Sequence, residues 1–221
     1  MRYREIGKTG VEVSVLGFGC MRLPTVDNVN ENIDESKAIE IVRHAIDNGL
    51  NYLDTAYFYH GGNSESFVGK VIKDGYRNKA YIATKLPLGN VNSEEDVEKI
   101  FNDQLNRLGV DYVDFYLLHA VNNDSWDNKV VKFDIMSKLE NFKEQGKIRH
   151  LGFSFHDDLW VFKKVIDAYD KFEFCQIQLN YIDVDYQAGI EGLEYAASKG
   201  LGVIVMEPLL GGKLANPAEI V

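Results

Sequence analysis

The chain has 221 residues, of which 45% are hydrophobic and 26% charged, and its formal net charge is -10. This acidity argues against nucleic acid or an anionic membrane as a partner, because both call for a basic surface. Cys20 and Cys175 lie far apart without a CxxC or Cys/His spacing, so the sequence predicts no disulfide framework and no metal site. The first residues are polar and no stretch is long and apolar enough to span a bilayer, which favours a cytoplasmic protein.

The predicted secondary structure begins with a β-hairpin and continues as alternating strands and helices. Residues 3–6 and 11–15 form the hairpin around Gly7-Lys8-Thr9-Gly10, and a short strand follows over 16–20. Asp34 is expected to cap the first helix, which Asn48-Gly49 ends. The further strands are predicted at 51–54, 80–85, 112–118, 148–153, 174–179 and 202–206, and the further helices at 64–73, 94–108, 131–145, 157–169 and 186–199.

These strands are short and mostly apolar on both faces, and an amphipathic helix follows each of them, which is typical of a parallel sheet covered by helices. Glycines after several helices supply the left-handed cap that returns the chain to the sheet: Gly49, Gly109, Gly146 and Gly200. The pattern predicts an α/β fold, namely a TIM-type (β/α)8 barrel with an N-terminal β-hairpin, as a single domain over residues 1–221.

The number of strands bears on this interpretation, because a closed barrel needs eight. Seven strand–helix beginnings are present and the sequence stops after the seventh strand, so we expect a barrel truncated there that lacks its last βα unit. Open edges would then invite self-association. A doubly wound sheet is the alternative, but Gly17-Phe18-Gly19 is too slight for its phosphate-binding turn.

Four residues with chemical potential stand at or just beyond the ends of three predicted strands: Asp54, Tyr59, Lys85 and His119. The C-terminal ends of barrel strands meet at one mouth, where barrel enzymes have their active sites. Tyr59 is the candidate general acid, and the Lys85 ammonium is expected to lower its pKa from about 10. Asp54 would hold Lys85 charged, and His119 would orient a carbonyl. The sequence therefore predicts proton transfer to a carbonyl oxygen beside a bound hydride donor.

Taken alone, each of these residues also has a purely structural interpretation. Asp54 could cap a turn and Tyr59 could pack within its loop. Lys85 could be a solvated strand end, and His119 could be a core histidine. Their joint position at one mouth favours the chemical reading. The remaining histidines, His44, His60, His150 and His156, are given no functional role. In the segment 121–130, Asp124 and Asp127 are interpreted as helix caps, and Trp126 either lines a pocket or belongs to the cap of the next helix.

The motifs around these residues give the chain a specific resemblance. They are Leu53-Asp54-Thr55-Ala56 with Tyr59, Thr84-Lys85, Leu117-Leu118-His119, Gly152-Phe153-Ser154 and Met206-Glu207-Pro208-Leu209. In this order the chain resembles the aldo-keto reductase family. The resemblance implies that Asp54, Tyr59, Lys85 and His119 are a catalytic tetrad and that Tyr59 donates the proton. It further implies that hydride passes to an aldehyde or ketone from NADP in its reduced form, with NAD as the alternative.

The resemblance also implies a cofactor site. Ser154 and Gln176, with Asn180 nearby, match positions that hold the nicotinamide carboxamide, and Leu209 to Gly212 match the loop that crosses the pyrophosphate. The predicted cofactor-binding residues are Gly17, Cys20, Met21, Asp54, Ser154, Gln176, Met206, Pro208, Leu209, Gly211 and Gly212. Phe155 stands where the family often has Asn. Met206 stands where an aromatic residue commonly stacks on the nicotinamide, and a thioether also packs on a ring.

The phrase Gly-Cys-Met-Arg-Leu-Pro is similar to a bacterial and archaeal subgroup that often carries a C-terminal iron–sulfur ferredoxin-like segment, whose cysteines this sequence does not contain. Three other functions stay open. They are a cofactor-binding regulatory or scaffold barrel, an inactive fragment that needs a partner chain to complete the barrel, and a phosphate-handling barrel enzyme. For the last of these, Leu210-Gly211-Gly212-Lys213 is the only matching feature.

Overall fold

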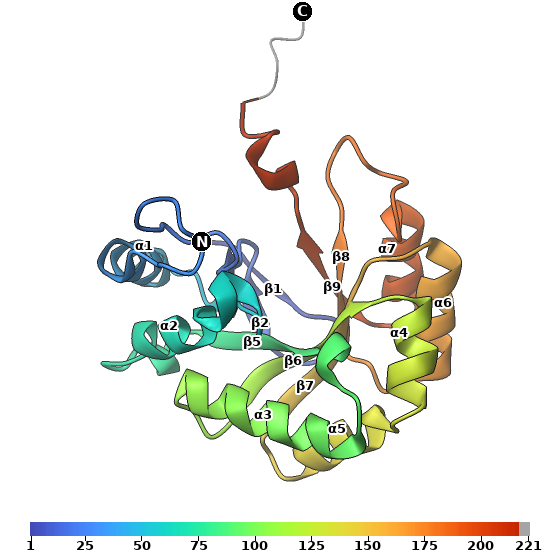
Figure 1. The fold of residues 1–221 in the computed structure, drawn as a ribbon. Helices are drawn as coiled ribbons and strands as arrows, with labels where there is room; N and C mark the ends of the chain where they lie inside the picture. The colour runs from blue at the N-terminus through green and yellow to red at the C-terminus, as the bar shows by residue number, and fades with distance from the viewer. Residues whose placement is uncertain (217–221) are drawn as a thin grey trace, which may run out of the picture.

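The computed structural model describes residues 1–216 and contains a curled parallel sheet with helices packed on its outer side (Figure 1). The strand order is β3-β4-β5-β6-β7-β8-β9, and every neighbouring pair is parallel. The strands are β3 (Phe18–Gly19), β4 (Tyr52–Asp54), β5 (Tyr81–Pro87), β6 (Val113–Val121), β7 (Ile148–Phe155), β8 (Phe174–Gln178) and β9 (Gly202–Met206). Within residues 1–216, β3 and β9 each pair with a single strand. The predicted α/β barrel-type architecture is confirmed.

The predicted helices lie close to their expected ranges, with ends shifted by a few residues, and the short helix Asn123–Ser125 was not predicted. The helices are α1 (Glu35–Asp47), α2 (Ser64–Val71), α3 (Glu94–Leu108), α4 (Asn123–Ser125), α5 (Ile135–Glu144), α6 (Leu159–Ala168) and α7 (Gly189–Ser198). Asp34 caps α1, where its carboxylate accepts from the Lys37 amide at 3.2 Å. Gly109 ends α3 at φ 65°, which is the left-handed cap expected of it. No helix within residues 1–216 is long and apolar enough to cross a membrane.

The N-terminal hairpin closes one end of the sheet. It consists of β1 (Tyr3–Glu5) and β2 (Glu12–Ser14), paired antiparallel as predicted. Its turn packs against the beginning of β9, where a Cβ on Gly202 would lie only 2.3 Å from the Ile6 side chain. Because β9 begins at Gly202, the hairpin covers the N-terminal ends of the strands and leaves their C-terminal ends open.

Two apolar clusters hold the fold together. The larger one lies between the sheet and the helices and includes Phe101, Leu118 and Phe153. A smaller cluster of Tyr52, Phe115, Phe174 and their neighbours contacts Ile6 of the hairpin. The aromatic rings of Tyr52 and Phe115 lie 5.3 Å apart, and those of Phe115 and Phe174 lie 5.2 Å apart. Large side chains therefore fill the inside of the curl below the open end, as barrels of this class require.

The segment before α5 differs from the prediction. Asn122, and not an acidic residue, caps α4 by accepting from the Ser125 amide at 2.8 Å. A π-helical turn, η4 (Trp126–Val131), follows and precedes α5. Asp124 instead accepts from Asn128 at 2.7 Å, and Asp127 pairs with Lys164 at 2.8 Å. The interpretation of these acids as helix caps was wrong, because a neighbouring amide side chain takes that position.

Trp126 also has a definite environment. Its side chain is buried, with 4% exposure, and its ring lies 6.3 Å from that of Phe172. The ring therefore packs in the core, and neither of the two readings that the sequence left open, a pocket wall or part of a helix cap, describes this packing.

Candidate active site at the open end of the sheet

Lys85 is the centre of the site. Its side chain is 1% exposed, and its ammonium donates to both carboxylate oxygens of Asp54 and to the Thr55 carbonyl, each at 2.8 Å. The hydroxyl of Tyr59 is 3.5 Å from the same nitrogen. Burial alone lowers the pKa of Lys85, but attraction to Asp54 and Tyr59 outweighs it and the net pKa is raised. The ammonium is therefore charged at neutral pH.

The parallel register explains why these residues meet. Asp54 is the last residue of β4, whereas β5 continues past Lys85 to Pro87 and β6 continues past His119 to Val121. β5 therefore ends two residues, and β6 three residues, beyond the predicted strand ends. Pro87 and His119 are register partners, and Tyr59 begins the short 3₁₀ turn η1 (Tyr59–Gly62) after β4. The Tyr59 and His119 rings meet edge to face at 6.0 Å. All four residues of the predicted tetrad lie together.

The electrostatics of Tyr59 correct one sequence prediction. Lys85 does act to lower the pKa of the phenol, but burial raises it more, so the net pKa lies above its usual value of 10.0. The expectation of a phenol with a lowered pKa was wrong, because the strand pattern gave no measure of how deeply the hydroxyl is buried. Tyr59 is therefore fully protonated at neutral pH and is available as a proton donor.

His119 is neutral in this setting. Burial lowers its pKa to about 3, and the charges of Lys85 and His156 act in the same direction. A neutral imidazole carries one N–H donor and one acceptor. It can hydrogen-bond a carbonyl oxygen without placing a second full positive charge beside Lys85.

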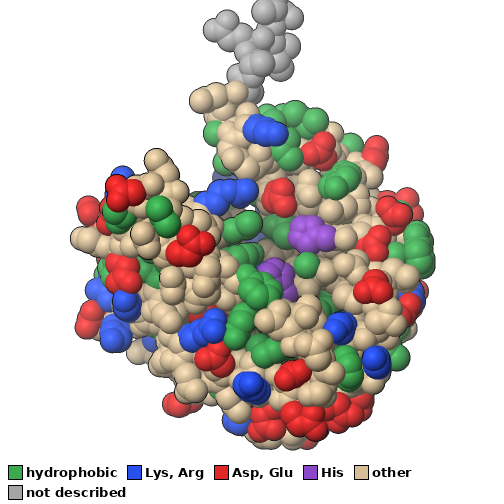
Figure 2. Space-filling model, viewed as in Figure 1, with side chains coloured by type: hydrophobic (Ala, Val, Ile, Leu, Met, Phe, Trp, Pro, Cys, Tyr) green, Lys and Arg blue, Asp and Glu red, His purple; other side chains and the backbone are tan. Residues whose placement is uncertain are grey.

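A cavity of about 350 Å³ opens beside His119. Phe58, Pro87 and Leu88 form an apolar wall, and Asn122 and Lys129 are among the polar residues that line it. Figure 2 shows this face of the molecule hollowed, with histidine and hydrophobic side chains exposed in the hollow. The cavity therefore combines an apolar surface with a few polar groups, His119 among them, which is the usual composition of a small-molecule site.

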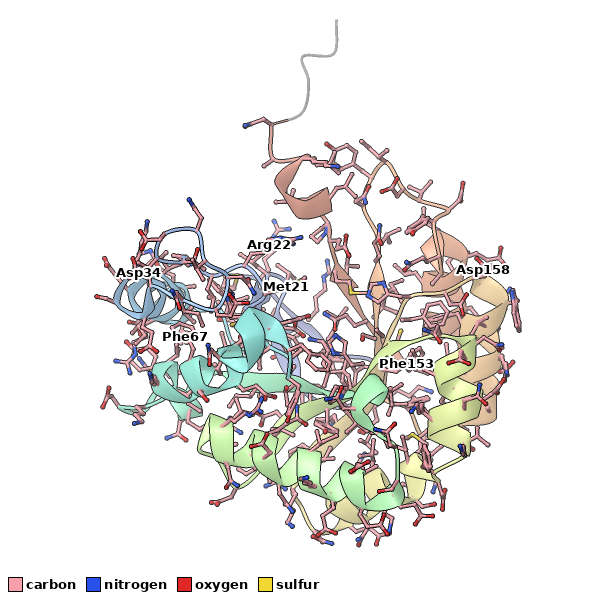
Figure 3. The ribbon with its side chains drawn as sticks, in the orientation of Figure 1. Met21, Arg22, Asp34, Phe67, Phe153 and Asp158 are labelled. Atoms are coloured by element: carbon pink, nitrogen blue, oxygen red, sulfur yellow. The ribbon has the colours of Figure 1, made fainter. Side chains whose placement is uncertain are left out.

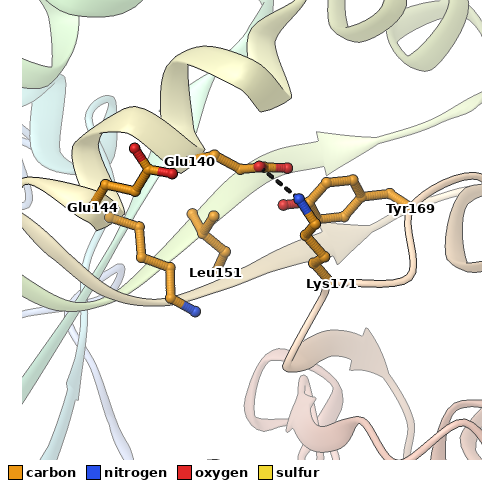
Figure 4. Close-up of a pocket in the computed structure, with 6 residues that line it drawn as sticks. Glu140, Glu144, Leu151, Tyr169 and Lys171 are labelled. Atoms are coloured by element: carbon orange, nitrogen blue, oxygen red, sulfur yellow. Dashed lines mark hydrogen bonds and ion pairs between the residues drawn. The ribbon is translucent and has the colours of Figure 1, made fainter.

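A second cavity has a volume of about 250 Å³, and Figure 4 shows the residues that line it. Its walls come from α5, β7 and the segment after α6, and they include Glu140, Glu144, Tyr169 and Lys171. Glu140 and Lys171 form an ion pair at 2.7 Å across it. Its residues include none of the tetrad, and within residues 1–216 no group of His, Cys, Asp and Glu side chains is placed to hold a metal ion.

The residues predicted to hold a nicotinamide carboxamide have different surroundings. The Ser154 hydroxyl accepts from the Ala120 amide at 2.8 Å and donates to the Leu118 carbonyl at 3.4 Å, so it ties β7 to β6. Gln176 donates to Asp54 at 3.4 Å, while its side-chain oxygen is buried without a hydrogen-bond partner among residues 1–216. Asn180 accepts from the amides of residues 182 and 183 and organises its own loop.

Three predicted cofactor contacts, Gly17, Cys20 and Met21, lie in or next to the predicted strand 16–20, and they differ in burial. The Cys20 thiol is fully buried in the core, and burial raises its pKa, so it is protonated at neutral pH. Gly17 lies close to Tyr52, since a Cβ there would be 3.2 Å from that ring. Met21 is 51% exposed and borders the gap between the N-terminal segment and the C-terminal turn (Figure 3).

That C-terminal turn follows β9 directly. Met206 ends the strand opposite Gln178, and the turn η5 (Leu210–Gly212) comes after the exposed Pro208 and Leu209. Gly211 and Gly212 have φ of 66° and 98°, which is a backbone conformation suited to glycine. A Cβ on Gly211 would lie 3.6 Å from the guanidinium of Arg22. Figure 3 shows Arg22 at the same gap as Met21.

Sequence reasoning missed three residues around the mouth. Arg22 faces the glycine turn, as described above. His60, directly after Tyr59, accepts from the Leu23 amide at 3.1 Å, and its other ring nitrogen lies 2.6 Å from the Asn30 carbonyl, so it holds that segment against the Tyr59 turn. His156 lies 3.4 Å from Gln187 and contributes to the lowered pKa of His119. Adjacency to Tyr59 could have indicated His60, but the other two depend on long-range contacts.

Comparison with known proteins shows which family the chain resembles. The model of the aldo/keto reductase family matches residues 15–219. L-galactose dehydrogenase of Arabidopsis thaliana is 33% identical over 220 residues, which are 96% of this chain and 67% of the relative. Probable aldo-keto reductase 1 of Glycine max is 33% identical over 158 residues, which are 68% of this chain and 44% of the relative. In that alignment the chain spans less than half of the relative's length.

Solved structures lead to the same family. Aldo-keto reductase AKR11C1 from Bacillus halodurans, in its holo form, superimposes with a TM-score of 0.76 at 28% identity, covering 96% of this chain and 68% of that one. The fold is of the α/β barrel type. Its titratable residues cluster at the C-terminal strand ends, where enzymes of this fold have their active sites. The chain belongs to the aldo/keto reductase family.

Proposed function

We propose that this protein reduces an aldehyde or ketone to an alcohol, with Tyr59 as the proton donor and NADPH as the source of hydride. NADH is the alternative source. The observation that carries the proposal is the Lys85 ammonium, which is fixed by both oxygens of Asp54 at 2.8 Å and lies 3.5 Å from the Tyr59 hydroxyl. A protonated phenol beside a fixed cation is suited to release a proton when a basic oxygen forms next to it.

Each residue then has a defined part in the reaction. A nicotinamide cofactor bound at the mouth would supply the hydride for the carbonyl carbon. Tyr59 gives its proton to the carbonyl oxygen and becomes a phenolate, whose charge Lys85 stabilises. This stabilisation is greater after proton transfer than before it, so it lowers the barrier instead of only strengthening binding. Asp54 keeps the ammonium in place, and the neutral His119 is available to donate to the carbonyl oxygen.

The residues near the mouth fit a dinucleotide. The buried side-chain oxygen of Gln176 lacks a partner within the described residues and can accept from a carboxamide N–H. Arg22 lies beside the glycine turn at Gly211 and can pair with an anionic phosphate. Exposed groups around the same gap, including Met21 and Leu209, would cover the cofactor. The other predicted contacts, namely Gly17, Met206, Pro208 and the Ser154 region, remain proposals.

The test is oxidation of NADPH with a panel of aldehydes and quinones, run beside Tyr59→Phe. We expect Tyr59→Phe to lower turnover by about 10²- to 10⁴-fold while cofactor affinity, measured by fluorescence, is retained. Tyr195→Phe is the matched control, because that tyrosine lies on α7 and its hydroxyl bonds to the exposed Asp167 near the end of α6. Equal turnover in Tyr59→Phe would contradict the role of the phenol. Cofactor binding without turnover in the wild type would instead favour the regulatory or scaffold alternative.

Two further predictions accompany this function. A cytoplasmic location remains a prediction from the composition. Self-association through β3 and β9 remains one as well, and sedimentation of the chain at several concentrations would check it.

A further inference from the structure

A buried carboxylate lies behind the catalytic strand, on the side of the sheet that the helices cover. Glu65 of α2 is completely buried. One of its oxygens accepts from the Thr84 hydroxyl at 2.6 Å and from the Gln104 amide at 2.7 Å. Thr84 precedes Lys85 in β5, so Glu65 ties the helix that follows the Tyr59 turn to the strand that carries Lys85.

Gln104 of α3 extends this network to Lys85 itself. Its side-chain nitrogen donates to the Lys85 carbonyl at 3.0 Å, and its oxygen accepts from the Tyr116 hydroxyl at 2.6 Å. Gln104 and Tyr116 are both fully buried. The backbone of Lys85 is thus held from behind by a side chain with no apparent part in the reaction.

Arg107 connects the same network to the loop before Tyr59. Its guanidinium lies 3.6 Å from the second oxygen of Glu65 and 2.8 Å from Asp103. It also lies 4.0 Å from the centre of the Tyr57 ring and donates to the Tyr57 carbonyl at 3.4 Å. The Tyr57 hydroxyl in turn donates to Asp103 at 3.0 Å. Arg107 and Asp103 therefore hold Tyr57, two residues before Tyr59, at its ring, its hydroxyl and its backbone.

This arrangement is costly for the fold. The second oxygen of Glu65 has no hydrogen bond among residues 1–216, and burial raises the pKa of the carboxyl although Thr84 and Gln104 oppose the shift. An apolar side chain at such a position is often neutral or stabilising by comparison. Glu65 contacts the strand that carries Lys85, and Arg107 contacts the loop that carries Tyr57. These contacts therefore favour a role in fixing the positions of Lys85 and Tyr59 over a role in stabilising the fold.

We propose that Glu65 and Arg107 are positioning residues that set the separation between the Lys85 ammonium and the Tyr59 hydroxyl. Glu65 fixes the strand side of this pair, Arg107 fixes the loop side, and their mutual contact joins the two. The inference rests on the proposed function for its catalytic meaning. The separation of 3.5 Å lies at the limit of a hydrogen bond, so a small loosening on either side weakens the action of Lys85 on the phenol.

The first arm of the test needs no activity. Protein labelled with ¹³C in its tyrosine rings gives a Tyr59 signal by NMR, assigned by its loss in Tyr59→Phe. We expect Glu65→Gln and Arg107→Met to shift this signal at neutral pH, because the field of Lys85 at the ring changes. Glu35→Gln is the matched control, since it breaks only the exposed ion pair of Glu35 with Lys70 on the outer side of α2. It should leave the signal unchanged.

The second arm uses turnover. We expect kcat to fall by about 10- to 100-fold in Glu65→Gln and Arg107→Met, with cofactor affinity unchanged, because misplacement by less than an ångström has effects of this order. In a Tyr59→Phe background the same substitutions should cause little further loss, since residues that act through one group are non-additive. A purely structural role would lower the rate in both backgrounds.

Tyr57→Phe serves if a variant does not fold, because it removes only the hydroxyl that bonds to Asp103 and keeps the ring under Arg107. It should shift the Tyr59 signal in the same direction by a smaller amount. An unchanged Tyr59 signal in the folded variants, or equal losses in both backgrounds, would overturn the inference. A wild type without turnover but with shifted signals in the variants would contradict the proposed function alone.

Discussion

Replacing Lys85 by Met tests the buried ion pair at the centre of the site. The change removes an ammonium that is 1% exposed and leaves the Asp54 carboxylate, 13% exposed, with Gln176 at 3.4 Å as its remaining side-chain partner. Breaking a buried pair from one side costs about 3–5 kcal/mol in the free energy of unfolding, because the other charge stays buried. We expect a loss of that size in urea denaturation at neutral pH. Adding Asp54→Asn to Lys85→Met should recover part of it.

The pH dependence of this loss follows from the raised pKa of Lys85. A cation whose pKa is higher in the folded state adds stability that is fully present below its unfolded value, near 10.5, and is lost as pH rises through the folded value. The difference between wild type and Lys85→Met should therefore be constant around neutrality and shrink only in the alkaline range. A difference below about 1 kcal/mol, typical of exposed pairs, would refute this reasoning.

Three further predictions concern other parts of the molecule. The depressed pKa of His119, about 3, means that its contribution is present above pH 6.5 and is lost as pH falls from there towards 3. Its imidazole should thus be neutral by NMR at pH values near 5, and His119→Phe should flatten the acid limb of the stability curve. Gly152→Ala should cost about 1–3 kcal/mol in urea denaturation, since a Cβ would lie 2.5 Å from the Phe174 carbonyl oxygen. Arg22→Met should weaken NADPH binding about 10-fold in a fluorescence titration if Arg22 pairs with a phosphate beside Gly211.

The sequence was sufficient to predict the architecture and to predict that the four residues of the tetrad lie together. Short apolar strands alternating with amphipathic helices specify a parallel sheet, and the C-terminal ends of such strands meet at one edge. Asp54, Lys85 and His119 each stand near the end of a predicted strand, so their convergence followed from topology without any side-chain detail. Tyr59 follows β4 closely enough to reach the same place.

The features that the sequence did not predict depend on how deeply side chains are buried and on contacts between distant segments. The sign of the Tyr59 pKa shift is decided by burial against the charge of Lys85, and the sequence gives only the second of these. The proximity of Arg22 and Gly211 joins segments from opposite ends of the chain. The hydroxyl of Ser154, a residue whose predicted cofactor contact stays a prediction, also bonds to β6, and no local pattern reveals this tie between strands. The π-helical turn at Trp126 likewise has no simple sequence signature.

The most direct test of the central claim follows the hydride itself. NADPH deuterated at C4, in each of its two configurations, would be incubated with the protein and an aldehyde that supports turnover, and the alcohol would be analysed by mass spectrometry. The account predicts deuterium at the carbinol carbon from one of the two cofactors, and loss of the labelled product in Tyr59→Phe although cofactor still binds. Binding of cofactor by the wild type without any labelled alcohol would contradict it.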